Sequence, residues 1–386
     1  MQGGFGGFGG FGGFGGFGGF GGFGGFGGFG GFGGFGGFGG FGPPVGYSPA
    51  ALIQHRDGIA GSWTRPGVGV AQLPEETPAN LDLWESWVRA EAVHFDLTAN
   101  LQFSADAARG GYTLWHVEVP PATPAATICQ PIVNMIRPPS PPDPFWLDQL
   151  DIVANWADLR ADRAEEISAQ LTPPIAFWST ILNLHPERRQ WTLELVFAAL
   201  RLANRVEMRF KHALACRRAV EMSPQIQPMI LTPGHGSLPS GHATEAFIVA
   251  FVLWKLILVN EPGKSTEWLE QLMRQAARVA INRTVAGVHF PVDSAAGQLL
   301  GLTLGAYFWR RATQPVAFNG WQFDGTRFSS HADFEWRTQF DATNDAQTGT
   351  ASGSAARINL GSTTPQPLAV APLLAHLWIR AAAEWP

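Results

Sequence analysis

The stretch PSGHATEAFIVAFVLWKLILV, residues 239–259, does most to set the fold, because it joins a tight turn to a long apolar helix. Residues 242–259 are apolar on most faces, which predicts a helix buried in a core. A Ser-Gly turn that opens a helix presents free backbone N–H groups and the positive end of the helix dipole, and both favour an anion. Ser240 can cap the helix and donate its hydroxyl group. By itself, the stretch also fits an ordinary helix N-cap.

A second motif, RTVAGVHFPVD, spans residues 283–293. We expect Arg283 at the end of a long helix and His289 in the following turn. Pro291 starts the next helix and places Asp293 in its first turn. From there, Asp293 can reach one imidazole nitrogen of His289 and orient the other towards a ligand. A His-Asp pair that only joins two helices fits the same pattern.

A third motif is the pair Lys211 and Arg218, which lie seven residues apart in a helix-like stretch. Seven residues are nearly two helical turns, so we expect both side chains to project from one face. The pair alone also fits a solvated basic face.

In this order, the three motifs resemble the superfamily shared by vanadium-dependent haloperoxidases and type 2 phosphatidic acid phosphatases, which includes bacterial non-specific acid phosphatases. The resemblance covers roughly residues 204–313, under a third of the chain. It implies a mainly α-helical bundle. The departures from the family pattern are Ala219 after Arg218 where Pro is usual, Asn282 before Arg283 where Ser is frequent, and Met208 where algal and fungal haloperoxidases have Trp.

The resemblance also implies a role for each motif residue. Three cationic side chains, one backbone amide and one hydroxyl would hold a tetrahedral oxyanion. We call these residues the oxyanion cradle: Lys211, Arg218, Ser240, Gly241 and Arg283. His289, oriented by Asp293, would bond to the central atom, and His242 would be the acid–base group.

Two chemistries fit this cradle. In a haloperoxidase, His289 would bind the metal of a vanadate cofactor, and hydrogen peroxide would oxidise a halide, bromide or iodide. In a phosphatase, His289 would attack the phosphorus of a phosphomonoester. The chain adds roughly 100 residues before the core and 70 after it, which is typical of haloperoxidases. His235 lies five residues before Ser240, as an active-site His does in bromoperoxidase-like members, so we predict the haloperoxidase, with the phosphatase as the alternative.

The remaining pattern predicts the organisation of the chain. Residues 43–144 are expected to pack on the core, 145–314 to form the helical catalytic core, and 315–386 to form a C-terminal extension that is irregular or short-stranded before a final helix. Residues 45–140 mix short apolar runs with Pro and Gly. The predicted helices are 80–94, 145–170, 174–184, 187–217, 242–259, 265–285, 291–311 and 371–384.

Residues 1–42 form a separate segment in which the triplet Gly-Gly-Phe repeats until Phe41. A period of three matches an extended helix of the polyproline-II type, which would place every Phe on one side. Such rods could drive self-association into a filament or oligomer. A low-complexity tail, natural or engineered, fits the same residues. A protein displayed on a structural fibre is therefore a third hypothesis for function.

Composition excludes several other classes. The net charge of −5 and the lack of basic runs argue against nucleic-acid binding. No apolar run reaches the roughly 20 residues of a membrane span. Cys129 and Cys216 are expected as two buried free thiols. No secretory signal is visible, and localisation stays open, with an extracellular or cell-surface site favoured.

Overall fold

The computed structural model describes residues 49–385 apart from 66, 68, 70, 120–126, 260–264, 314–317, 343–345, 349–355 and 361–366. The chain divides into two compact units, residues 1–92 and 93–386. The Gly-Gly-Phe segment lies outside the described residues, so its predicted rod stays a prediction, as does the division of the chain at residues 144 and 314.

The first unit has little regular structure among its described residues. It holds α2 (Pro49–Ile59), η2 (Pro78–Leu83) and the start of α3 (Ser86–Thr98). The sequence predicts a single helix over residues 80–94, and this is wrong. Trp84 has an extended backbone, which ends the first helical turn and lets a second helix begin at Ser86.

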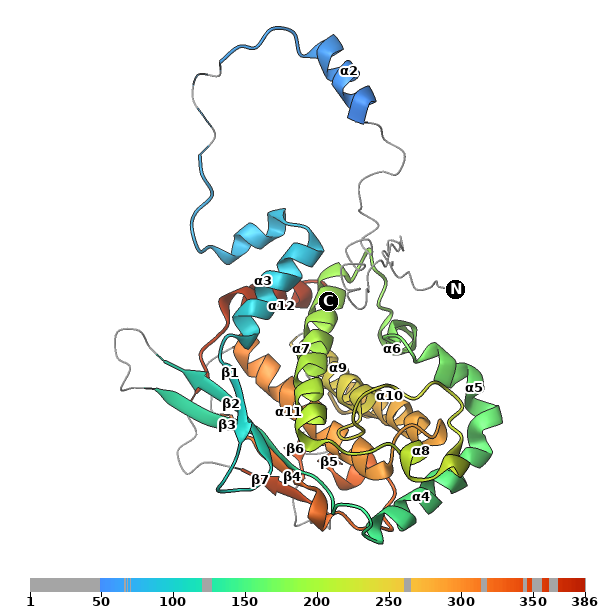
Figure 1. Cartoon of the computed structure of the whole chain (residues 1–386). Coiled ribbons are helices and arrows are strands. Elements are labelled where there is room, and N and C mark those ends of the chain that lie inside the picture. The colour runs from blue at the N-terminus through green and yellow to red at the C-terminus, as the bar shows by residue number, and fades with distance from the viewer. Residues whose placement is uncertain are drawn as a thin grey trace. The chain divides into compact units, whose positions relative to one another are not determined.

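The second unit is mainly α-helical, as predicted (Figure 1). Its longer helices pack against each other through their apolar faces. They are α4 (Phe145–Trp156), α5 (Arg160–Ala169), α6 (Ile175–Leu182), α7 (Gln190–Leu214), α9 (Gly241–Ile257), α10 (Ser265–Val285), α11 (Pro291–Thr313) and α12 (Pro372–Ala382). Short helical turns are η4 (Ala157–Leu159), α8 (Ala219–Met222), η5 (Pro224–Ile226), η7 (Gly325–Arg327) and η8 (Trp336–Thr338).

Two other predicted helices differ clearly from the structure. The predicted helix 145–170 is two helices, because η4 interrupts it. The predicted helix 187–217 is shorter at both ends. Pro186 lies in a turn before α7, where the N–H of Arg188 donates to the carbonyl of His185. At the other end, Ala215 has a positive φ of 50°, which ends the helix.

Helices α9 and α11 pack closely because α11 carries glycines four residues apart, which face one side of the helix. A Cβ at Gly297 would lie 2.7 Å from the carbonyl oxygen of Ser240, and one at Gly301 would lie 2.5 Å from that of Thr244. Gly305 continues this line against Phe251. The absent side chains let the two backbones approach, and this fixes the N-terminus of α9 beside that of α11.

A five-stranded sheet accompanies the helices in the second unit. Its strand order is β1 (Leu101–Ala105), β2 (Tyr112–Glu118), β3 (Ile128–Ile136), β4 (Trp321–Asp324) and β7 (Arg357–Asn359). The pairing of β3 with β4 is parallel and the other pairings are antiparallel. A further pair joins β5 (Phe340–Asp341) and β6 (Ala346–Gln347). The short-stranded C-terminal extension agrees with prediction, but the strands β1 to β3 were not predicted.

The residues that follow α12 bind to the start of α7. The carboxylate of Glu384 accepts hydrogen bonds from the backbone N–H of Trp191 and of Thr192, at 3.0 and 2.8 Å. Both N–H groups lie in the first turn of α7, where the helix itself supplies no acceptor and a negative charge is favourable. Glu384 therefore acts as an N-cap supplied from a distant part of the chain.

Neither cysteine is in a disulfide, as predicted, but only one of them is buried. Cys216 is buried, and burial raises the pKa of its thiol to about 12. Cys129 is exposed on β3, so the prediction of two buried thiols is wrong for it. Within the described ranges, none of the helices has the length and hydropathy that a membrane crossing requires.

Candidate active site

The three sequence motifs meet where four helix ends come together. These are the C-terminal ends of α7 and α10 and the N-terminal ends of α9 and α11. Hydrogen bonds join them: Lys211 to the loop before α9, Ser240 to the backbone of Asp293, and Arg218 to His289. The structure thus brings the predicted residues into one cluster, which is buried apart from the half-buried His242 and the exposed His235 at its rim.

Lys211 lies in the last turn of α7, with 2% of its surface exposed. Its ammonium donates to the carbonyl oxygens of Gly236, Ser237 and Pro239, at 3.3, 3.2 and 2.5 Å. These bonds hold the loop that leads into α9. Burial lowers the pKa of Lys211 to about 8, and the nearby carboxyl of Glu207 opposes this shift.

Arg218 reaches the same cluster by a route that differs from the prediction. It does not share a helix face with Lys211, because α7 ends at Leu214 and Ala215 turns the chain. Arg218 precedes α8 in an extended conformation, and its guanidinium turns inwards. It is 1% exposed and donates to the carbonyl oxygens of His235 (3.0 Å) and Val288 (2.6 Å). The turn after α7, not helical spacing, brings the two cations together.

His289 is held by a partner at each ring nitrogen. Nδ1 is 3.0 Å from Oδ2 of Asp293, and Nε2 is 3.1 Å from Nη1 of Arg218. Because arginine only donates, Nε2 carries the lone pair and Nδ1 carries the hydrogen. Burial and the charge of Arg218 lower the pKa of His289 well below its usual value, so the ring is neutral. A neutral imidazole whose Nε2 carries no hydrogen suits a nucleophile or a metal ligand.

Asp293 is a fully buried acceptor for several donors. Its Oδ2 receives hydrogen bonds from Nδ1 of His289, the backbone N–H of Phe290 and the hydroxyl of Ser237. Burial raises the pKa of this carboxyl, and the hydrogen bond from Ser237 works in the opposite direction. Ser237 was not predicted as part of the site, and nothing in its spacing marks it.

The Ser-Gly turn opens α9 as predicted. Ser240 is the N-cap, and its hydroxyl oxygen accepts from the N–H of Ala243 at 3.4 Å. Gly241 is the first residue of a 17-residue helix, so its N–H lies at the positive end of the dipole. The imidazole of His242 follows at the second position.

His242 has a defined tautomer. Its Nε2 is 2.9 Å from the backbone carbonyl oxygen of Gln170, so Nε2 carries the hydrogen and Nδ1 has the lone pair. Burial and the charge of Arg283 lower the pKa of His242 to about 3. The neutral ring can therefore accept a proton at Nδ1.

Arg283 has the most unusual surroundings of the cradle residues. It is 1% exposed, and its Nη2 donates to Oε1 of Gln170 at 2.8 Å. Its Nε and Nη1 have no hydrogen-bond partner among the described residues. Burial lowers the pKa of Arg283 to about 10, which leaves it charged at neutral pH. A buried guanidinium with two donors that lack partners has the chemistry that suits an anion.

His235, at the rim, also reaches the cradle. The side chain is exposed, and its Nδ1 is 3.2 Å from Nη2 of Arg218. Burial of part of the ring and the charge of Lys211 lower its pKa. His235 therefore lies beside the motif residues, as predicted.

Two carboxyl groups near the cradle were not predicted, the buried Glu207 and the half-buried Glu245. Oε1 of Glu207 would lie 2.5 Å from a Cβ at Gly241, and Oε2 has no partner among the described residues. Burial raises the pKa of Glu207 well above its usual value. Burial also raises the pKa of Glu245 to about 7. Glu207 precedes Lys211 by one turn of α7, but an acid at that spacing usually indicates a surface ion pair.

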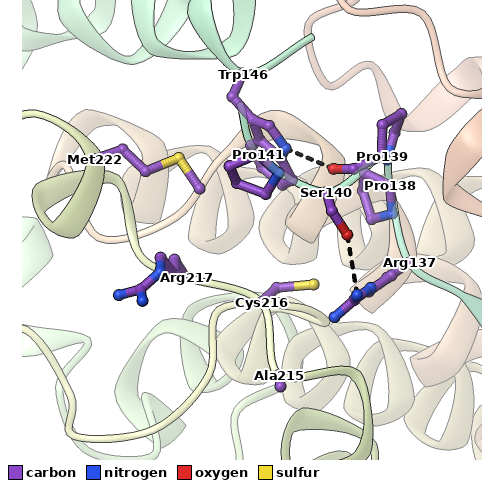
Figure 2. A pocket seen from close by; sticks show the side chains of 10 residues that line it. All are labelled: Arg137, Pro138, Pro139, Ser140, Pro141, Trp146, Ala215, Cys216, Arg217 and Met222. Carbon is purple, nitrogen blue, oxygen red and sulfur yellow. Dashed lines mark hydrogen bonds between the residues drawn. The ribbon is translucent and has the colours of Figure 1, made fainter. Parts of the chain in front are cut away.

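A pocket of about 230 Å³ lies beside the segment that links Lys211 to Arg218 (Figure 2). Cys216, Arg217, Arg137 and Trp146 are among the residues that line it. Trp146 donates to the carbonyl oxygen of Pro139 at 2.7 Å, and its ring lies 5.0 Å from that of Phe290, the neighbour of His289. None of the predicted site residues lines this pocket.

Comparisons with known proteins match part of the chain to a known family. A family model described as the PAP2 superfamily matches residues 193–315, a range that contains every predicted site residue. Among solved structures, the chain is similar to the crystal structure of the first transmembrane PAP2 type phosphatidylglycerolphosphate phosphatase from Bacillus subtilis. The identity is 16% and the TM-score 0.33, with 59% of this chain and 92% of that chain covered. No curated protein matches the chain.

Proposed function

We propose that this chain hydrolyses a phosphomonoester with His289 as the nucleophile, because a model of the PAP2 superfamily, whose members are phosphatase-type enzymes, matches residues 193–315. The observation that carries the proposal is the buried guanidinium of Arg283 with its open donors Nε and Nη1. A phosphoryl group offers the oxygens that such donors need.

The charge around His289 supports a dianionic substrate. Lys211, Arg218 and Arg283 are buried cations, and each is at most 2% exposed. The N-terminus of α9 adds the backbone N–H of Gly241 and the hydroxyl of Ser240. In such a desolvated setting, fixed donors stabilise the charge of a transferring phosphoryl group strongly.

The reaction would proceed in two steps. First, Nε2 of His289 forms a bond to phosphorus while the bond from phosphorus to the ester oxygen breaks. The hydrogen stays on Nδ1 and remains hydrogen-bonded to Asp293, whose carboxylate stabilises the positive charge that develops on the ring. Then a water oxygen attacks phosphorus, the nitrogen–phosphorus bond breaks, and inorganic phosphate leaves.

His242 would move the protons in both steps. In the first step its protonated Nδ1 gives a proton to the leaving alkoxide, and in the second the neutral Nδ1 takes one from the attacking water. With a pKa of about 3, His242 is neutral near neutral pH, so it needs the charge of a bound substrate to become the acid of the first step. The negative charge of a bound phosphoryl group favours the protonated ring and raises this pKa.

A second candidate is the vanadate-dependent haloperoxidase that the sequence predicts. Vanadate has the tetrahedral oxygens that suit the same cradle, and the lone pair on Nε2 of His289 suits its central atom. When bound, vanadate would supply the activation of hydrogen peroxide towards a halide. The specific observation in favour is His235, whose exposed ring contacts Arg218 at the rim and could exchange a proton with peroxide.

One pair of assays separates the candidates. The intact protein should hydrolyse p-nitrophenyl phosphate, and orthovanadate should inhibit this reaction. His289→Ala should abolish it, whereas His331→Ala, at an exposed histidine paired with Asp148, should not. Bromination of a phenolic dye that depends on orthovanadate, peroxide and bromide, without phosphomonoester hydrolysis, would favour the haloperoxidase. His235→Phe should lower bromination alone. Absence of both activities would contradict both candidates.

We propose in addition that residues 1–42 drive self-association. The Gly-Gly-Phe period, which can align every Phe on one side of an extended helix, supports this. Negative-stain microscopy should show filaments or oligomers for the intact chain and monomers for a chain that begins at residue 43. Identical monomers in both samples would contradict this proposal.

A further inference from the structure

We propose that the side-chain amide of Gln170 is a further ligand of the bound oxyanion and that it keeps the charge of Arg283 available to that anion. This rests on the proposed function, because it concerns the same site. Gln170 is the C-cap of α5 and is fully buried. It lies far from the three motifs in sequence, and neither its spacing nor its surroundings in the chain mark it.

The orientation of the Gln170 amide is fixed by its neighbours. Nη1 of Arg163 donates to Oδ1 of Asn282 at 3.0 Å, so Nδ2 of Asn282 must be the atom that faces Gln170. Nδ2 of Asn282 and Nη2 of Arg283 donate to the oxygen of Gln170, at 3.1 and 2.8 Å. Arginine has no acceptor, so neither amide can be reversed without placing donor against donor.

This orientation leaves Nε2 of Gln170 as a buried donor. It has no hydrogen-bond partner among the described residues, and the same is true of Nε and Nη1 of Arg283. A buried donor without a partner costs about 1–3 kcal/mol. Three such donors on two hydrogen-bonded side chains form one unsatisfied cluster. An oxyanion has enough lone pairs to satisfy all three.

The backbone of Gln170 serves the same site. Its carbonyl oxygen accepts from Nε2 of His242 at 2.9 Å, which directs the lone pair on Nδ1 away from α5. Its N–H bonds to carbonyls in the last turn of α5 and holds the residue in place. Gln170 thus touches both the acid–base group and a cationic ligand.

The neutrality of Gln170 matters for the charge of the cradle. The charged groups around it are Glu166 and Arg163 on α5, Arg278 and Arg283 on α10, and the titratable His242 on α9. Glu166 is engaged by Arg278 through bonds of 2.9 to 3.1 Å. A carboxylate at position 170 would neutralise Arg283 and place a negative oxygen where Nε2 now stands, and both effects would repel an anion.

The test measures binding of inorganic phosphate to the full chain by isothermal titration calorimetry. Gln170→Glu has nearly the same shape as the native residue. At about pH 8 it should bind phosphate at least tenfold more weakly than the wild type, a change of about 1.4 kcal/mol. The ratio of the two affinities should shrink towards about pH 4, as the new carboxyl takes up a proton and regains a donor. A merely structural role would not produce this dependence on pH.

Two further variants complete the design. Gln170→Met removes the donor without adding charge and should weaken phosphate binding at all pH values. Gln298→Glu places the same carboxyl at another fully buried glutamine, one whose amide donates to the carbonyl of Trp336 at 3.1 Å. It should lower the thermal unfolding temperature without weakening binding. Wild-type affinity in Gln170→Glu and Gln170→Met, or an equal loss in Gln298→Glu, would overturn the inference.

The two proposals fail in different ways. If the wild type neither binds phosphate nor hydrolyses a phosphomonoester, the proposed function is wrong. If the wild type does both and the Gln170 variants bind phosphate as it does, only the role of Gln170 is wrong. If Gln170→Glu does not fold, Gln170→Met still decides between these results.

Discussion

The backbone N–H of Ser240 donates to the carbonyl oxygen of Asp293 at 2.9 Å, so the N-terminus of α9 is tied directly to the first turn of α11. A second bond, from the hydroxyl of Ser237 to Oδ2 of Asp293, joins the same two segments. His242 and His289 each lie within a few residues of these bonds. Their relative positions are therefore set by a short, buried network.

Asp293→Asn should lower phosphomonoester hydrolysis by about 10- to 100-fold, as loss of such an orienting partner typically does. Oδ2 of Asp293 accepts from three donors. An amide nitrogen in its place is itself a donor and cannot accept these bonds. The tautomer of His289 would then no longer be fixed. Steady-state kinetics measure the loss. Asp333→Asn, at an acid that accepts from Trp156, is the control, and an equal loss there would contradict a specific role.

Gly241→Ala should destabilise the protein by about 1–3 kcal/mol, as overpacking in a buried site does. The new Cβ would lie 2.5 Å from Oε1 of Glu207, whose carboxyl is buried and cannot move into solvent. Urea unfolding measures the cost. Combined with Glu207→Ala, the substitution should cost less than in the wild-type background, because the clash is gone. Strict additivity of the two costs would show that the residues do not touch.

Glu245→Gln should make stability less dependent on pH. Burial raises the pKa of Glu245 from 4.5 to about 7, so the folded state binds a proton more tightly than the unfolded state. The stability from this group is fully present below pH 4.5 and is lost as the pH rises through about 7. Between these two pH values, the free energy of unfolding should fall less steeply with pH in the variant. The difference in slope should correspond to about one bound proton. An unchanged slope would contradict the raised pKa.

Gly301→Ala should separate α9 from α11 and cost about 1–3 kcal/mol. Its Cβ would lie 2.5 Å from a backbone oxygen of Thr244, which cannot rotate away. Activity should fall with stability, since the same packing sets the start of both helices. Gly58→Ala is the matched control, because nothing lies within 4 Å of its Cβ position. Thermal unfolding followed by circular dichroism compares the two, and equal effects would contradict close packing.

Much of the cradle could be predicted because its chemistry is local. The turn before α9 and the junction of α10 with α11 place Ser240, Gly241, His289 and Asp293 through short-range geometry alone. Arg218 meets the other motif residues, but the predicted route was wrong, since helical spacing cannot reveal that Ala215 takes a positive φ. The strand β3 escaped prediction because Pro131 and the buried Asn134 interrupt the alternation that marks a strand.

The sequence by itself determined the helical core and the set of motif residues that meet at one place in it, because both follow from the period of apolar residues and from chemical groups a few positions apart. Only the tertiary structure decided which other groups surround that cluster. Gln170 reaches Arg283, and Glu207 meets Gly241, across helices that are distant in the chain. The parallel pairing of β3 with β4 likewise depends on the helices between them. Contacts of this kind depend on packing, which local sequence does not encode.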